Sequence, residues 1–126
     1  MAHDCGRVIN PLIVDGQVQG GVAHGIGNCF YEELIYDDNG QLLNASFMDY
    51  LLPTANEVPT AKLAHVEVIC PLNPLGVKGA GEGGTIPSAA AFAAAVEDAL
   101  APFGVTVTEV PLSPEKVRKL LRAAGW

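Results

Sequence analysis

Apolar residues in the first third of the chain recur at helical spacing. From Leu12 to Tyr36 they fall at steps of three and four residues along one face, and the Asn10-Pro11 pair just before them is a helix-start signal. Glycines interrupt this face, although each costs about 1 kcal/mol relative to alanine inside a helix; they are Gly16, Gly20, Gly21, Gly25 and Gly27. The pattern predicts a helix whose glycine face lies very close to another backbone or to a ligand.

Short β-type runs and turn signals occupy much of the rest of the chain. Asp37–Gly40 predicts a hairpin turn, because its Asn-Gly pair supplies the positive φ angles of a type I′ turn. We expect strands near Leu34–Tyr36 and Gln41–Ala45 on either side of this turn. Two further strands are expected at Ala64–Ile69 and Val105–Val110.

Two helices and a long loop complete the expected elements. The alanine-rich segment Ser88–Leu100 predicts a helix that Ser88 could cap, and Ser113-Pro114 begins a last helix as N-cap and first residue. The glycine- and proline-rich segment Cys70–Pro87 is a loop of the length that is usually functional. Together these elements predict an α+β fold in a single domain over residues 1–126, with one mixed or antiparallel sheet packed with helices.

Composition and charge narrow the classes of protein. With 126 residues, 49% hydrophobic and 17% charged, the chain is long and apolar enough for one ordinary core. Its net charge of −7 argues against a nucleic-acid or anionic-membrane partner. We expect no membrane span and no secretory signal, since the longest apolar run, Ala89–Val96, is short and no charged region with an apolar run opens the chain.

Three cysteines occur without any Cys-x-x-Cys or Cys/His cluster. Their wide spacing argues against a zinc site and favours a reducing, cytoplasmic location; they are Cys5, Cys29 and Cys70. Cys29 stands among apolar residues, and we expect it to be a small core residue.

The most informative segment is the glycine loop Asn73–Thr85, which holds five glycines, one acid and one base. Gly81 and Gly83 flank Glu82, so that another group can approach the carboxylate closely; an acid in this setting is either a candidate general base or a solvated loop residue. Lys78 is either its ion partner or an unrelated surface cation.

The same glycines also match a dinucleotide fingerprint. Gly79-x-Gly81-x-x-Gly84 has the spacing, and Glu109 could stand for the ribose-binding acid. Two features count against this reading: nine residues with two prolines separate Ile69 from Gly79, and Glu82 would face a pyrophosphate with like charge.

A second cluster, Gly16–Gly21, carries two amide side chains. The amides of Gln17 and Gln19 suit a polar heterocycle or a terminal oxo ligand, while the alternative is a tightly packed helix with hydrated glutamines. His24, farther along the same segment, has no second ligand at helical spacing and is expected to be an ordinary core or surface histidine.

Several motifs occur in an order that resembles one known family. They are Asp4–Pro11, Gly16–Gly21 with Gly25–Gly27, Asp49-Tyr50 with Pro53, and Pro74–Gly84. In this order they resemble the C-terminal part of the molybdopterin-binding large subunit of the xanthine dehydrogenase / aldehyde oxidase family, and most of all its branch like aerobic carbon monoxide dehydrogenase. The resemblance runs from about Asp4 to Leu121.

The resemblance implies part of a molybdenum hydroxylase, which oxidatively hydroxylates an aldehyde or N-heterocycle, or oxidises CO. It implies molybdopterin cytosine dinucleotide with molybdenum as cofactor, Glu82 as the catalytic base and Gln17 as a cofactor contact near the metal. Residues whose missing side chains let the backbone approach the cofactor would be Gly16, Gly79, Gly81 and Gly83. No residue of this chain is expected to ligate the metal, because the pterin dithiolene does so.

The implied partners are the remainder of the large subunit, iron–sulfur and flavin (FAD) subunits, and a small-molecule substrate. This chain departs from the family in having His24 where a glutamine is common, and in being several times shorter. We therefore expect no activity from the chain alone. A catalytically inactive fragment or interaction module that keeps the fold is the alternative from another class, and a small dinucleotide-binding protein is a lesser one.

Overall fold

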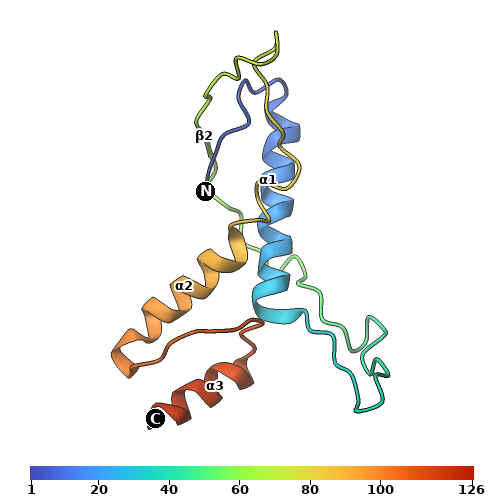
Figure 1. Ribbon diagram of the computed structural model, residues 1–126, viewed down its shortest axis with the longest axis vertical. Helices are drawn as coiled ribbons and strands as arrows, with labels where there is room; N and C mark the ends of the chain where they lie inside the picture. Colours follow the sequence, from blue (N-terminus) through green and yellow to red (C-terminus); the bar gives the residue numbers. More distant parts are fainter.

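The computed structural model describes all 126 residues, arranged around one long helix. In chain order the elements are β1 (Ala2–His3), α1 (Pro11–Ile26), the π-helical turn η1 (Gly27–Tyr31), β2 (Ala64–His65), α2 (Ser88–Leu100), the 3-10 turn η2 (Ala101–Phe103) and α3 (Pro114–Ala123). Figure 1 shows α1 as a central rod, with the N-terminal segment and β2 beside its upper half and α2 and α3 at its lower end. Residues 32–58, here called the arm, extend from the same lower end on the other side.

The predicted start of α1 is confirmed. The Asn10 side chain accepts a hydrogen bond from the Ile13 amide at 3.3 Å, and Pro11 occupies the first turn, where its missing N–H has no partner to lose. One face of the helix is buried. Val18 there and Cys29 in η1 are fully excluded from solvent, which confirms Cys29 as a core residue.

The glycine face of α1 lies against other backbone, as predicted. A Cβ added at Gly21 would stand only 2.7 Å from the Gly84 Cα and the Thr85 amide nitrogen, and one added at Gly25 would run into Ser88. Close packing of the glycine loop and of the start of α2 on the helix therefore requires glycine at these two positions.

The sheet is smaller than the sequence patterns indicate. It consists of β1 and β2 alone, paired in parallel with Ala2 opposite Ala64 and His3 opposite His65. The α+β expectation is met only in this coarse form. Antiparallel pairing occurs only as isolated bridges, one of them joining Tyr36 to Leu42.

Most of the other expected strands are irregular segments. Residues 66–69 and 105–110 form no strand, and the amide of Val107 is satisfied by the Glu97 carboxylate at 2.6 Å. Several side chains of these runs are exposed, among them Val66, Val68 and Ile69. The β-type pattern thus marks apolar runs that pair with no strand of this chain.

The hairpin turn at Asp37–Gly40 forms, but with a different backbone from the one predicted. The Asp37 amide donates to the Gln41 carbonyl at 3.0 Å, and Gly40 has φ +80°. Since no non-glycine residue has positive φ, Asn39 does not take the conformation of a type I′ turn. The Asp37 carboxylate instead accepts from the amides of Gln41 and Asn39, and these bonds, that from Gln41 most of all, lower the pKa of Asp37.

The N-terminus of α3 is capped as predicted, whereas that of α2 differs from the prediction. Ser113 caps α3 by accepting from the Lys116 amide at 3.3 Å, as predicted. Ser88 does not cap α2: Pro87 holds the cap position, and the Ser88 hydroxyl donates to the Gly84 carbonyl at 2.5 Å. This bond ties the start of α2 to the glycine loop.

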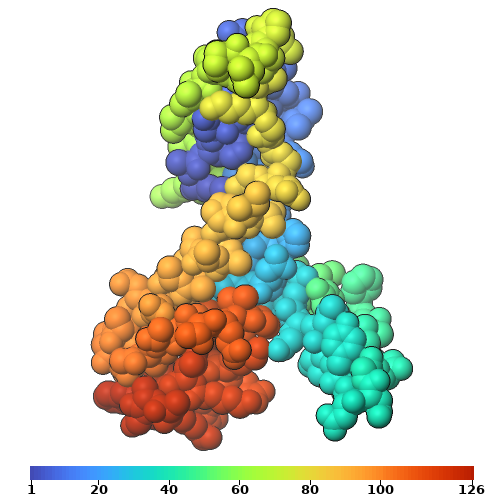
Figure 2. Space-filling view, in the orientation of Figure 1, coloured from blue at the N-terminus to red at the C-terminus, as the bar shows by residue number.

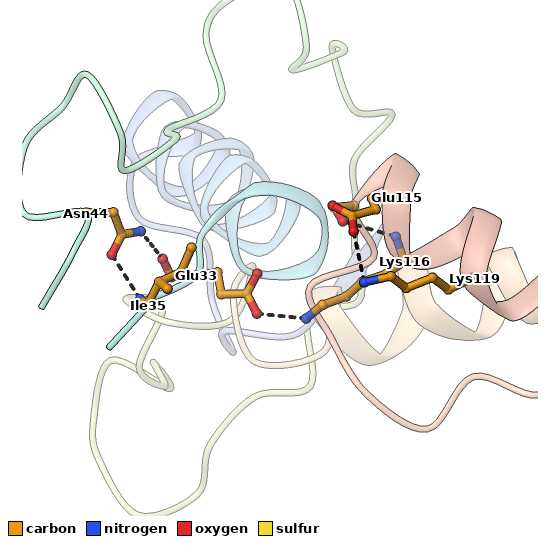
Figure 3. A network of polar contacts seen from close by, with 7 residues as sticks. Glu33, Ile35, Asn44, Glu115, Lys116 and Lys119 are labelled. Carbon is orange, nitrogen blue, oxygen red and sulfur yellow. Dashed lines mark hydrogen bonds and ion pairs between the residues drawn. The ribbon is translucent and has the colours of Figure 1, made fainter. Parts of the chain in front are cut away.

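Polar contacts join the base of the arm to α3. Figure 3 shows the Lys116 ammonium reaching the Glu33 carboxylate, at 2.8 Å. Beside it, Asn44 accepts from the Ile35 amide at 2.9 Å and donates to the Glu33 carbonyl. Asn44 is buried, so these bonds satisfy its amide while they pin the two sides of the arm together.

The chain does not form the ordinary core that its length predicts. Only 17 of 126 residues are buried, and large apolar side chains such as Phe47, Met48 and Leu72 are 85–90% exposed. The accessible surface is 8476 Å², about 2,000 Å² more than a compact monomer of this mass presents. The space-filling view shows the cause, which is three lobes with little between them (Figure 2). No helix is both long and apolar enough to cross a bilayer.

Candidate functional site

The glycine loop is anchored at both ends. At its start, residues 76–78 run antiparallel to the N-terminal segment: the Lys78 amide donates to the Cys5 carbonyl at 2.7 Å, and the Arg7 amide donates to the Gly76 carbonyl at 3.0 Å. At its end, Gly84 packs on α1. The span between these anchors, Gly79–Gly83, contains Glu82.

Glu82 presents a free carboxylate. Its side chain is exposed and makes no hydrogen bond or ion pair within the chain. Its backbone carbonyl accepts from the amides of Thr85 at 3.0 Å and Ile86 at 3.1 Å, which holds the residue at the head of a turn leading into α2. The residue is thus fixed through its backbone, while the carboxylate stays available to a group outside the chain.

Lys78 is the ion partner of Asp4 and not of Glu82. Its ammonium donates to Asp4 Oδ2 at 2.5 Å, while the amides of Gly6 and Val68 donate to Asp4 Oδ1 at 2.8 and 3.3 Å. The Lys78 bond, followed by that from Gly6, lowers the pKa of Asp4. The structure therefore decides between the two roles that the sequence left open for Lys78: it fixes the start of the loop and leaves Glu82 unpaired.

The two glutamines of α1 have different roles. Gln19 donates to the Pro59 carbonyl at 2.9 Å and accepts from the Ala61 amide at 2.8 Å, so it holds the segment that leads into β2. Gln17 is exposed, and its amide makes no hydrogen bond within the chain. Only Gln17 can therefore offer both a donor and an acceptor to a ligand.

The candidate glycines also fall into two groups. Gly16, Gly79 and Gly81 are exposed, have ordinary φ values, and would place an added Cβ more than 4 Å from any other part of the chain. At Gly83 a Cβ would overlap the imidazole of His3. Packing against His3 thus explains why residue 83 is glycine, and no contact within the chain explains the other three glycines.

The loop contacts α1 at residues that are close in sequence to both candidate side chains. Gly84 lies against the Val18 carbonyl and Gly21 of the helix. Gln17 immediately precedes Val18, and Glu82 lies two positions before Gly84. Figure 1 shows this part of the loop running along the helix before it enters α2.

A cluster that the sequence analysis missed lies beside this contact. The Nε2 atom of His65 stands 2.7 Å from the Asp15 carboxylate on α1, and the His3 ring meets the His65 ring edge-to-face at 5.9 Å between centroids. These residues are up to 62 positions apart, and no local pattern could have joined them. His24 lies exposed on α1, and the chain gathers no group of three or more potential metal ligands.

Comparison with known proteins places the chain among molybdopterin enzymes. Residues 1–59 match a family model described as a molybdopterin cofactor-binding domain. The chain is 48% identical over 115 residues, 91% of its length, to the nicotine 6-hydroxylase large subunit of Paenarthrobacter nicotinovorans, of which it covers 14%. It is 40% identical over 119 residues, 94% of its length, to the carbon monoxide dehydrogenase large chain of Hydrogenophaga pseudoflava, of which it covers 15%.

A solved structure agrees with these sequence matches. The fold superposes on quinoline 2-oxidoreductase from Pseudomonas putida 86 with a TM-score of 0.93 and 47% identity, covering 96% of this chain and 15% of that one. The chain belongs to the family of molybdopterin-binding large subunits to which xanthine dehydrogenase and carbon monoxide dehydrogenase belong.

As a member of this family, the chain spans only about one seventh of the length of the relatives that it matches. Gly16 precedes Gln17 and Gly81 precedes Glu82, so at both places the backbone beside a free polar side chain is open to a group from outside the chain.

Proposed function

We propose that this chain is the part of a molybdenum hydroxylase that contributes cofactor contacts and the catalytic base Glu82. The observation that carries the proposal is the set of three glycines without a reason inside the chain, Gly16, Gly79 and Gly81, beside a free amide and a free carboxylate.

The energetics of Gly16 support a ligand at this place. Alanine there would stabilise α1 by about 1 kcal/mol, and neither backbone conformation nor packing within the chain opposes it. A ligand that approaches the helix backbone closely would explain why glycine stands at position 16. At Gly79 and Gly81 in the loop helix propensity plays no part, but the φ values and the free space would also accept a side chain there, which would reduce the conformational entropy of the unfolded chain.

We assign the group as molybdopterin cytosine dinucleotide with molybdenum. When bound, the metal centre supplies the redox chemistry by which an aldehyde or N-heterocycle is hydroxylated, or CO is oxidised. The Gln17 amide would hydrogen-bond the cofactor and orient it. No side chain of this chain acts as a metal ligand.

Glu82 accepts the proton released in the reaction. Its carboxylate has no ion pair to break, because Lys78 is bound to Asp4. The turn formed on its carbonyl fixes the backbone, so the carboxylate moves only through its own side-chain torsions. Covering by the remainder of the subunit excludes water from this face and leaves the carboxylate as the proton acceptor at the site.

The partners follow from the exposed surface. About 2,000 Å² of excess surface on one chain matches what one side of an obligate interface buries, and the arm carries two highly exposed apolar side chains, Phe47 and Met48. We propose that the remainder of the large subunit covers the arm. Iron–sulfur and FAD-containing subunits accept the electrons, and the assembly works in the cytoplasm.

Glu82→Gln in the assembled enzyme tests the function. The substitution removes the base and keeps the size, so molybdenum content should stay the same while turnover falls by about two to four orders of magnitude. Glu109→Gln is the matched control, since Glu109 is exposed and lines clefts with residues of α2 and α3 and none of the glycine loop; it should change neither quantity. Equal turnover in Glu82→Gln and the unmodified enzyme would end the assignment of the base.

The two alternatives predict different results. An inactive fragment or interaction module yields an assembly without molybdenum, in which Glu82→Gln has no effect. A dinucleotide-binding protein yields a chain that melts at higher temperature with NAD or FAD and loses this shift in Glu109→Gln.

A further inference from the structure

The two-stranded sheet places His3 and His65 side by side. They are register partners in parallel strands, and side chains at partnered positions project from the same face of a sheet. Their rings pack at an interplanar angle of 80°, and the Nδ1 atoms of both rings are buried without a hydrogen-bond partner. Leaving buried polar atoms unpaired costs free energy, so filling space does not explain why both residues are histidine.

Each histidine holds one half of the candidate site. On one side, His65 Nε2 lies 2.7 Å from Asp15 Oδ1, and Asp15 immediately precedes Gly16 and Gln17 on α1. A carboxylate only accepts, so Nε2–H of His65 donates in this pair.

On the other side, the His3 ring seats the glycine loop. A Cβ added at Gly83 would lie 2.6 Å from His3 Cδ2, which shows that the ring edge fills the space a side chain would need. Gly83 is the residue after Glu82. The ring therefore sets the position of the backbone that carries the candidate base.

We infer that His3 and His65 are a positioning pair that sets Glu82 in the glycine loop against the Gly16–Gln17 turn of α1. The inference rests on the proposed function for the meaning of that placement. The path runs from Asp15 through His65 and His3 to Gly83 by one hydrogen bond, one edge-to-face ring contact and one ring–backbone contact. It acts through the loop, so neither histidine needs to touch substrate or cofactor.

The test compares His65→Leu with His65→Gln in the assembled enzyme. Leucine removes the bond to Asp15, so hydrogen exchange of the Gly79–Thr85 amides should rise about tenfold. Misplacement of Glu82 should lower kcat at least about tenfold with KM and molybdenum content unchanged. Glutamine keeps an N–H donor and should restore most of both losses.

Three further variants complete the test. Asp15→Ala removes the same hydrogen bond from a half-exposed position and should reproduce the losses of loop protection and kcat. It replaces His65→Leu in the test if that variant does not assemble. His3→Leu should loosen the loop without affecting the Asp15 bond. Glu115→Gln, which breaks an exposed ion pair with Lys119 on α3, is the control and should change neither exchange nor kcat.

Two results would overturn the inference. One is unchanged loop exchange and kcat in both leucine variants. The other is an equal loss in His65→Gln and His65→Leu, which would show that the bond to Asp15 does not position the loop. Loop exchange requires no turnover, so it tests the histidine pair even where Glu82→Gln proves active and the proposed function fails.

Discussion

Gly21 is where α1 and the glycine loop touch backbone to backbone, and replacing it tests the architecture of the site. An alanine Cβ there would lie 2.7 Å from the Gly84 Cα and the Thr85 nitrogen, while ordinary contact begins at 3.4 Å. Both neighbours are backbone and cannot rotate away. Gly21→Ala must therefore push the loop about 0.7 Å from the helix to restore normal contact.

The expected size of the effect follows from two opposing terms. Overpacking of a close contact costs about 1–3 kcal/mol, and replacing a helical glycine by alanine returns about 1 kcal/mol. The net cost at Gly21 is therefore about 1 kcal/mol. Gly20→Ala is the matched control, because it gains the same helix propensity and its Cβ meets nothing within 4 Å. The two variants should differ by about 2 kcal/mol, or about thirtyfold in the local opening equilibrium.

Hydrogen exchange read by mass spectrometry on the assembled protein measures this difference. Amides of residues 79–88 should exchange faster in Gly21→Ala than in the unmodified protein and be no faster in Gly20→Ala. Turnover should fall in Gly21→Ala, since the displaced loop carries Glu82. Equal protection of the loop in the two variants would refute the backbone contact on which the placement of the site depends.

Three other variants separate anchoring residues from ligand-binding ones. Because Lys78 lowers the pKa of Asp4 below its ordinary 3.8, ionised Asp4 stabilises the fold above that pH, and this stabilisation is lost as the pH falls through the lower pKa of the folded state. Asp4→Asn should abolish this acid-dependent loosening of residues 76–78, read as exchange against pH; an unchanged acid limb would contradict the pairing. Gln19→Ala should free the segment at Pro59 and raise its exchange, whereas Gln17→Ala should leave exchange alone and lower the molybdenum content. The reverse pattern would show that Gln17 anchors the chain and that Gln19 contacts the cofactor.

Features decided by neighbouring residues could be predicted from the sequence. The caps at Asn10 and Ser113 form because each side chain reaches an amide three positions ahead, which needs no tertiary contact. The glycine face of α1 was predicted because several glycines in one helix are costly unless something lies against them. The long loop after Cys70 was readable from its glycines and prolines alone.

Features that depend on strand pairing and on the covering of apolar side chains could not be predicted from the sequence. The run after His65 has β-type composition, yet only Ala64 and His65 pair, since a strand needs a partner along its whole length. Length and hydrophobicity indicated an ordinary core, but apolar side chains such as Phe47 and Leu72 remain exposed. Composition records how much apolar surface a chain carries and says nothing about which polypeptide covers it.

The amino-acid sequence by itself determined the family, through motifs kept in a fixed order, and singled out Glu82 and Gln17 as candidates. Only the tertiary structure decided that Lys78 binds Asp4, leaving Glu82 unpaired, and that Gln17 is the glutamine left free. Such choices depend on contacts between residues 40 to 74 positions apart. Local propensity and periodicity act over a few residues, so pairing at this range is settled only when the chain has folded.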